Sequence, residues 1–271
     1  MVYLVCHPIY SISQISFMSN KSLSDLEHQI RYSTAIREAR IKGMDVFQGW
    51  FDTSKSANQS LIRGYWDFVF HIIKPKVCEY IERPEDKIAL EIGYGGGRLL
   101  NAACSFFKQV IGIDIHDEKE TVKNFLRSQN KYNFILIKTP GRSIDIDSES
   151  VDFIYSFIVL QHLPTFEVFS NYLKEAYRCL KSGGVAQLYF GRFSKLNLLD
   201  QLIFFLKGYK EIESPVNHTS LVIRLAKVEE MCRNLGFKIV DTGPSYKGVP
   251  DGYPHRRGGQ NFITLLKPTK K

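Results

Sequence analysis

A glycine-rich stretch near the middle of the chain restricts its fold more than any other part of the sequence. Residues 89–92 form an apolar run interrupted only by Glu91, and four glycines follow at positions 93, 95, 96 and 97. Helix-forming residues resume at Arg98, so the stretch predicts a buried strand, a tight turn and a helix start. Glycines let the backbone approach a bound molecule, and the free N–H groups of a helix start favour an anion. We therefore expect a ligand at this turn, with a plain flexible connection as the alternative.

Strand and helix signals alternate on both sides of this turn, which is typical of a parallel sheet with right-handed crossovers. The predicted strands are 87–92, 109–114, 134–137, 151–156, 185–190, 237–241 and 261–266. The predicted helices of this part are 96–107, 118–129, 165–180 and 226–235. Helices are also expected at 22–41, 61–73 and 75–82, ahead of the first strand. An apolar helix at 196–205 interrupts the alternation and indicates an insertion.

The composition sets weak limits on partners. The chain has 271 residues, of which 44% are hydrophobic and 24% charged, as in a soluble globular protein. Its formal net charge of +8 and its pI near 9.1 favour anionic partners. Acidic residues are interleaved with the basic ones, however, so the charge predicts only weak attraction to nucleic acid or an anionic membrane.

The cysteines and the lengths of the apolar runs indicate the cellular compartment of the protein. The five cysteines are an odd number, widely separated, and without zinc-ligand spacing, so we expect free thiols and no metal. The first residues have no basic start ahead of an apolar core, which argues against a secretory signal. No run reaches the roughly 18 apolar residues of a membrane span. A cytoplasmic protein is therefore expected.

Two classes of cofactor fit a glycine turn after the first strand: dinucleotides and S-adenosylmethionine. A dinucleotide fingerprint needs a third glycine at the position that Arg98 occupies. A phosphate-binding P-loop needs a Gly-Lys-Ser/Thr sequence, which does not follow the glycines. S-adenosylmethionine is the better fit.

Four segments, taken in order, resemble class I S-adenosylmethionine-dependent methyltransferases of types 11 and 12. Residues 91–97 match the first motif of that family, and the strand that ends in Asp114 matches the second. Residues 151–163 resemble its fourth-strand motif, and residues 180–184 the turn before strand five. The resemblance implies an α/β fold: a Rossmann-like sheet of seven mostly parallel strands, the last one antiparallel, with helices on both faces.

The same resemblance divides the chain into two parts. Residues 1–83 are expected to form an N-terminal helical extension or lid, and residues 84–271 the S-adenosylmethionine-binding methyltransferase domain. A substrate-side insertion is expected at 193–224. The N-terminal helices, this insertion and the loop 243–259 are expected to surround the acceptor. Candidate lining residues in that loop are Tyr246, Tyr253, His255 and Arg256, unless the loop is plain surface.

The cofactor contacts follow from the motifs. Asp114 ends the second strand, where a carboxylate accepts hydrogen bonds from a ribose diol, although a helix cap is its alternative role. Glu91 accepts from the cofactor ammonium or only braces the loop. Relatives commonly have Gly-Asp after strand three, whereas this chain has Thr139-Pro140, so Ser143 or backbone groups take that place. The implied cofactor-binding residues are Glu91, Gly93, Tyr94, Gly95, Gly97, Asp114, Ile115, Arg142, Ser143, Ser156 and Phe157.

The resemblance implies transfer of a methyl group to an O or N atom of a small-molecule acceptor by in-line displacement, leaving S-adenosylhomocysteine. The sulfonium already activates the methyl group, so a general base is needed only for acceptors that are protonated at neutral pH. His162 is the candidate base because a neutral imidazole is available at pH 7, unless it only packs within its own turn. The alternatives are an RNA- or protein-directed methyltransferase and a non-catalytic, methyltransferase-like subunit.

Overall fold

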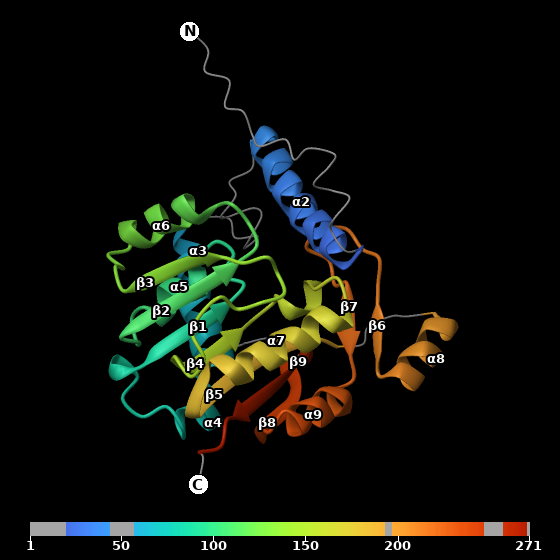
Figure 1. The fold of residues 1–271 in the computed structure, drawn as a ribbon. Coiled ribbons are helices and arrows are strands. Elements are labelled where there is room, and N and C mark those ends of the chain that lie inside the picture. Colours follow the sequence, from blue (N-terminus) through green and yellow to red (C-terminus); the bar gives the residue numbers. More distant parts are fainter. Residues whose placement is uncertain (1–19, 44–56, 193–196, 247–256, 270–271) are drawn as a thin grey trace.

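A seven-stranded sheet forms the centre of the protein in the computed structural model, which describes residues 20–43, 57–192, 197–246 and 257–269 (Figure 1). The strand order is β3-β2-β1-β4-β5-β9-β8. The strands are β1 (Ile88–Ile92), β2 (Gln109–Asp114), β3 (Phe134–Lys138), β4 (Val151–Ser156), β5 (Leu180–Gly191), β8 (Lys238–Tyr246) and β9 (Arg257–Leu266).

All neighbouring strands from β3 to β5 pair in parallel, and β9 pairs antiparallel with both β5 and β8. This confirms the expected α/β fold with its antiparallel last strand. The central strands read as nearly continuous apolar runs because helices cover both faces of the sheet. Glu91 pairs with Gly112 on one side and Tyr155 on the other, so β1, β2 and β4 end near the same level.

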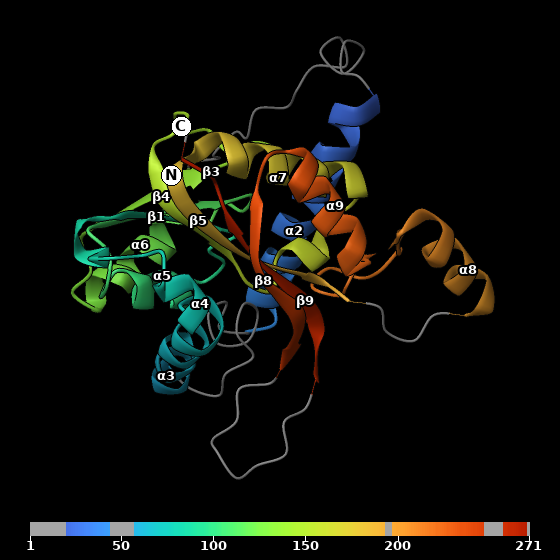
Figure 2. The ribbon, with the colours of Figure 1, turned by 90° about the horizontal axis from the view of Figure 1, so that it is seen from below.

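The described residues form eight α-helices, most of which lie beside the sheet (Figures 1 and 2). They are α2 (Asn20–Ile41), α3 (Ala57–Asp67), α4 (Pro75–Cys78), α5 (Arg98–Ala103), α6 (Lys119–Ser128), α7 (Phe166–Cys179), α8 (Leu198–Lys207) and α9 (Leu225–Asn234). Helices α7 and α9 pack into one apolar cluster, while α5, α6 and a π-helical turn after α3 (Phe68–Ile72) pack into the other. No helix in the described ranges has the length and apolar character needed to cross a membrane.

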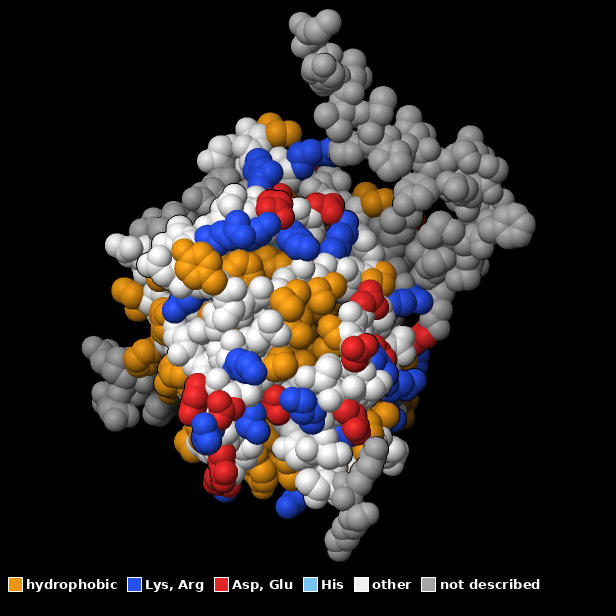
Figure 3. Space-filling view, turned by 60° about the vertical axis from the view of Figure 1, so that its left-hand side comes forward, with side chains coloured by type: hydrophobic (Ala, Val, Ile, Leu, Met, Phe, Trp, Pro, Cys, Tyr) orange, Lys and Arg blue, Asp and Glu red, His pale blue; other side chains and the backbone are white. Residues whose placement is uncertain are grey.

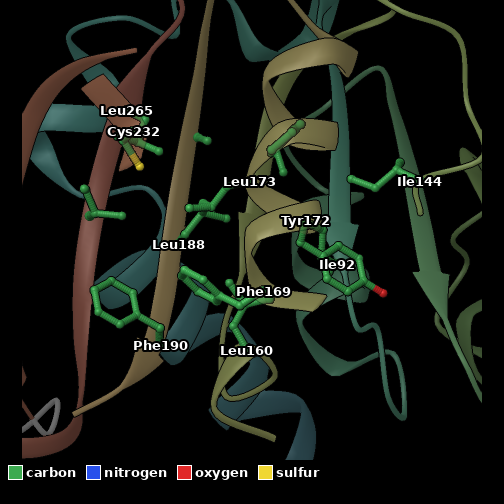
Figure 4. Close-up of a cluster of buried hydrophobic side chains, with 14 of the residues drawn as sticks. Ile92, Ile144, Leu160, Phe169, Tyr172, Leu173, Leu188, Phe190, Cys232 and Leu265 are labelled. Carbon is green, nitrogen blue, oxygen red and sulfur yellow. The ribbon is translucent and has the colours of Figure 1, made fainter. Parts of the chain in front are cut away.

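Helix α7 shows how the sequence builds one of these layers. Thr165 caps its N-terminus, with a side chain that accepts a backbone N–H at 3.3 Å. Phe169, Tyr172, Leu173 and Ala176 recur at helical spacing and are buried against the sheet (Figure 4). The apolar face of α7 therefore places the end of β4 and the turn that follows it.

Four differences from the expected elements are local. The helix expected at 61–73 changes to π-helical geometry at Phe68, and the one expected at 75–82 ends at Cys78. Strands β8 and β9 extend into the segment 243–259 that was expected to be a loop. Pro244 is tolerated there because β8 is an edge strand with irregular register. A ribbon of β6 (Tyr209–Glu211) and β7 (Leu221–Ile223) was not expected, since three-residue strands carry no readable period.

Gly64 brings α3 into close contact with α5. A Cβ atom at Gly64 would lie 2.5 Å from the Arg98 carbonyl oxygen, which belongs to backbone and cannot move aside. We expect Gly64→Ala to lower the free energy of unfolding by about 1–3 kcal/mol, as overpacking does. Chemical denaturation measures this. Gly259→Ala is the control, because no atom lies within 4 Å of that Cβ position, and equal losses in both variants would contradict the contact.

Candidate functional site

A cavity of about 480 Å³ opens at the carboxyl ends of β1, β2 and β4. The strand order reverses between β1 and β4, which is where open α/β sheets bind ligands. The glycine turn after β1 forms one wall. Gly93 donates its N–H to Ile113 at 2.8 Å, and Gly97 donates to Tyr94 at 2.7 Å. The turn is thus tied to β2 and folded back on itself beside the cavity.

Gly93 is required by its surroundings. It adopts a φ of +80°, and a Cβ atom there would lie 2.4 Å from a methyl group of Val159. L-residues with side chains rarely adopt this conformation. The backbone of the turn consequently lies against the segment after β4, and both segments line the cavity.

Asp114 joins the end of β2 to the glycine turn. Its two carboxylate oxygens accept the N–H groups of Gly95 at 2.8 Å and Ile115 at 2.7 Å. Each oxygen keeps further acceptor capacity toward the cavity that Asp114 lines. The two hydrogen bonds hold the carboxylate at the edge of the cavity.

His116 forms a hydrogen bond with the carbonyl group of Gly95. Its Nδ1 accepts the N–H of Glu118 at 3.1 Å, which makes Nε2 the protonated nitrogen of the neutral ring. That Nε2–H donates to the Gly95 carbonyl at 3.0 Å. The peptide groups on both sides of Gly95 are therefore fixed by the end of β2. Sequence reasoning missed His116, although its place two residues after Asp114 was a usable signal.

Glu91 lies at the base of the turn and is buried, with 2% of its surface exposed. Tyr155 donates its hydroxyl to the Glu91 carboxyl at 3.0 Å. Burial raises the pKa of Glu91 to about 8, against smaller opposing effects of this hydrogen bond and of Arg98. Glu91 also lines the cavity, so a cationic group bound there would favour its ionised form.

The raised pKa of Glu91 predicts a pH-dependent stability. Between its ordinary value near 4.5 and about 8, the folded protein binds more protons than the unfolded chain. Its free energy of unfolding should therefore fall through this window as the pH rises, by at most about 1.4 kcal/mol per pH unit. Glu91→Gln should lose this fall, whereas Glu85→Gln, at an exposed carboxyl, should keep it. Urea unfolding from pH 5 to 9 measures the difference, and parallel curves for wild type and Glu91→Gln would contradict it.

The structure brings most of the expected cofactor residues to one place. The following expected residues line the cavity: Glu91, Gly93, Tyr94, Gly95, Asp114, Ile115, Phe157 and His162. Gly97, Arg142, Ser143 and Ser156 do not line it. Ser156 donates its hydroxyl to the Ile92 carbonyl at 3.0 Å within the core. Direct cofactor contacts of these four residues stay predictions.

The fold of the segment after β3 explains why Arg142 and Ser143 do not line the cavity. Thr139 donates its hydroxyl to the Ser143 carbonyl at 2.6 Å, so the unusual Thr139-Pro140 pair folds the segment into a compact turn. The Ser143 hydroxyl is bonded to Asp145 at 3.0 Å. Gly141, rather than its neighbours, lines the cavity opposite Ile115. Tyr246, the last residue of β8, is exposed and outside the cavity, whereas Tyr253, His255 and Arg256 lie outside the described residues.

Helix α2 covers the cavity, a placement that local sequence patterns cannot give. His28 and Tyr32 of α2 line it. Gln29 donates to the Pro140 carbonyl at 2.7 Å, and Arg31 to the Ser214 carbonyl at 3.0 Å, on two different loops. Arg40 forms an ion pair with Glu118 at the start of α6. Helix α2 is thus attached to the segment after β3, to the loop after β6 and to the start of α6.

His162 lies where this cover meets the sheet. Its Nδ1 lies 2.8 Å from the His218 carbonyl oxygen, so Nδ1 carries the proton and donates to it. The other ring nitrogen, Nε2, accepts a hydrogen bond from the Gln161 side-chain amide at 3.1 Å. Burial lowers the pKa of His162, which keeps the ring neutral at pH 7. A second cavity of about 210 Å³ adjoins this point, between α2 and the loop after β6. Both cavities are lined by His28, Tyr32 and His162.

The comparisons with known proteins agree with this geometry. Residues 90–188 match the family described as the methyltransferase domain. No curated protein matches the chain. Among solved structures, a SAM-dependent methyltransferase from Methanosarcina mazei is 22% identical with a TM-score of 0.56, and the match covers 73% of this chain and 99% of that one.

Two further structures share the fold. An S-adenosylmethionine-dependent methyltransferase from Clostridium acetobutylicum is 16% identical with a TM-score of 0.56, over 76% of this chain and 92% of that one. The cyclase SpnF is 13% identical with a TM-score of 0.55, over 80% and 84%. These likenesses show the fold. Residues 90–188, which run from β1 into β5, thus match the methyltransferase domain family, and the solved structures share the fold of the chain. Its glycine turn and Asp114 belong to the matched region.

Proposed function

We propose that the protein transfers the methyl group of S-adenosylmethionine to an O or N atom of a small-molecule acceptor. One observation carries the proposal: two adjoining cavities, of about 480 and 210 Å³, are both lined by His28 and Tyr32 of α2 and by His162. The larger cavity holds the glycine turn and suits the cofactor. The smaller one has the size for a small acceptor and is covered by the extension that we assign as a lid.

The cofactor residues divide by chemistry. The carboxylate of Asp114 is assigned to the ribose diol, because an ionised carboxylate accepts two strong hydrogen bonds. Glu91 is assigned to the ammonium group, directly or through water. Ile115 and Gly141 lie on the side assigned to the adenine. The bound cofactor supplies an activated methyl group, so these residues need only hold it in one orientation.

The remaining residues orient the acceptor and exclude water. His28 and Tyr32 close the region between the cavities, and burial raises the pKa of Tyr32, which keeps its hydroxyl protonated. His162 is the proposed base for a hydroxyl acceptor, because its ring is neutral and its Nε2 lies near this boundary, where an acceptor hydroxyl would replace the Gln161 amide as the donor to Nε2. Alignment of the acceptor with the methyl group and exclusion of water supply the rest of the proposed rate acceleration.

The surface charge supports a small-molecule acceptor over RNA. On the face in Figure 3, basic and acidic side chains are interspersed, unlike the basic stripe of a nucleic-acid interface. Four cysteines of the described residues, Cys78, Cys104, Cys179 and Cys232, are free thiols, which supports a reducing compartment such as the cytoplasm.

Transfer of labelled methyl groups tests the acceptor class. The full chain is incubated with methyl-labelled S-adenosylmethionine and an extract separated into small molecules, RNA and protein. We expect label in the small-molecule fraction alone. His162→Gln should reduce that labelling by about 10²- to 10⁴-fold if the acceptor is a hydroxyl, as loss of a general base does. Label in RNA or protein would contradict the proposed acceptor class.

A further inference from the structure

Helix α8 presents an apolar face to solvent. No residue of α8 is buried. Five apolar side chains follow the spacing i, i+1, i+4, i+7 and i+8, which places them on one face of the helix. Their exposed fractions are large: Leu198 84%, Leu199 67%, Leu202 55%, Phe205 67% and Leu206 73%. A helix of a water-soluble domain normally turns such a face inward, as α7 does.

Helix α8 is capped at both ends. Asn197 accepts the N–H of Asp200 at 2.8 Å at the first turn, and Gly208 ends the helix in the left-handed conformation with a φ of +80°. The two ribbon views agree that α8 lies at the edge of the molecule, next to β6 and apart from the helices that cover the sheet (Figures 1 and 2). The apolar face is therefore held outward by a defined structure.

Cationic side chains border this face at its C-terminal end. Lys207 lies in the last turn, and Arg224 donates to the Phe205 carbonyl at 2.9 Å with its guanidinium 5.2 Å from the Phe205 ring. Neither forms an ion pair with a carboxylate in the described part of the chain. Lys210 and Lys227 add two cations that are paired, with Asp200 and Glu230. The uncompensated charge beside the apolar face thus comes from Lys207 and Arg224.

We propose that α8 docks the protein on an anionic membrane surface, with its apolar face in the boundary between headgroups and acyl chains. Apolar residues on one side and uncompensated cations beside them are the features of an interfacial helix. The overall charge of +8 acts in the same direction. A second copy of the chain suits the face less, because one helix of ten residues falls short of the roughly 800 Å² per partner that stable dimers bury.

Vesicle flotation tests the docking with the full chain. The protein should float with vesicles of phosphatidylcholine and phosphatidylglycerol, and bind less to phosphatidylcholine alone. Leu199→Glu/Leu206→Glu should weaken binding by at least about tenfold, since two apolar side chains no longer enter the bilayer. Lys207→Gln/Arg224→Gln should weaken it about tenfold and reduce its dependence on salt.

A matched control variant separates the effect of the apolar face of α8 from the effect of the net charge of the protein. Ile62→Glu/Tyr132→Glu changes the charge by the same amount at side chains of equal exposure, 69% and 71%, away from α8. We expect it to float like the wild type and all variants to keep the native circular dichroism spectrum. Absence of wild-type binding, equal loss in the control, or a dimer that only the α8 variant breaks would each overturn the proposal.

Discussion

Replacement of Asp114 by alanine is expected to weaken S-adenosylhomocysteine binding by about 10²- to 10⁴-fold. Two hydrogen bonds from a ribose diol to a charged group contribute about 1.5–3 kcal/mol each, and both are lost. The variant also frees the N–H groups of Gly95 and Ile115, which the carboxylate holds in place. Calorimetric titration with S-adenosylhomocysteine measures the loss.

A neighbouring carboxylate provides the control for Asp114. Asp117 is exposed and forms an ion pair with Lys138, and it does not line the cavity. Asp117→Ala should keep the wild-type affinity within about threefold, since exposed ion pairs contribute little. Unchanged affinity in Asp114→Ala, or equal losses in both variants, would show that Asp114 does not bind the ribose.

The second large effect is on stability. Phe169 is fully buried between α7 and the sheet, where it meets the ring of Phe190 edge to face at 5.8 Å (Figure 4). Phe169→Ala should lower the free energy of unfolding by about 3–5 kcal/mol, because it removes apolar contacts and leaves a cavity. Urea unfolding monitored by circular dichroism measures this loss.

Phe205→Ala is the matched control, because it removes the same atoms from a side chain that is 67% exposed on α8. Its unfolding free energy should stay within about 0.5 kcal/mol of the wild type. A small effect at Phe169, or a large one at Phe205, would mean that α7 and α8 are packed differently from what the structure shows.

The order of the elements was predictable because β1, β2 and β4 are apolar runs, each followed by a helix with its own period. The glycine turn, Asp114 and the end of β4 could be grouped from sequence, since carboxyl ends of parallel strands share one edge of the sheet. The positions of Gly97, Ser143 and Ser156 depend on details that a motif does not contain. Thr139 folding onto the Ser143 carbonyl is one such detail.

A lid was expected within residues 1–83, but the residues that it places over the cavity were the least predictable part. Tyr32 and Asn217 are far apart in sequence, yet both line the cavity. Nothing in the periodicity of α2 shows that His28 and Tyr32 face a cavity, because helix periodicity marks a buried face without naming what it covers. The same holds for the exposed face of α8, whose sequence reads like that of a core helix.

Titration of the full wild-type chain with S-adenosylhomocysteine tests the central claim most directly. The cavity at the ends of β1, β2 and β4 should bind the ligand with one-to-one stoichiometry, and Asp114→Ala should abolish most of that affinity. Folded protein that gives no heat at high micromolar ligand would contradict the account.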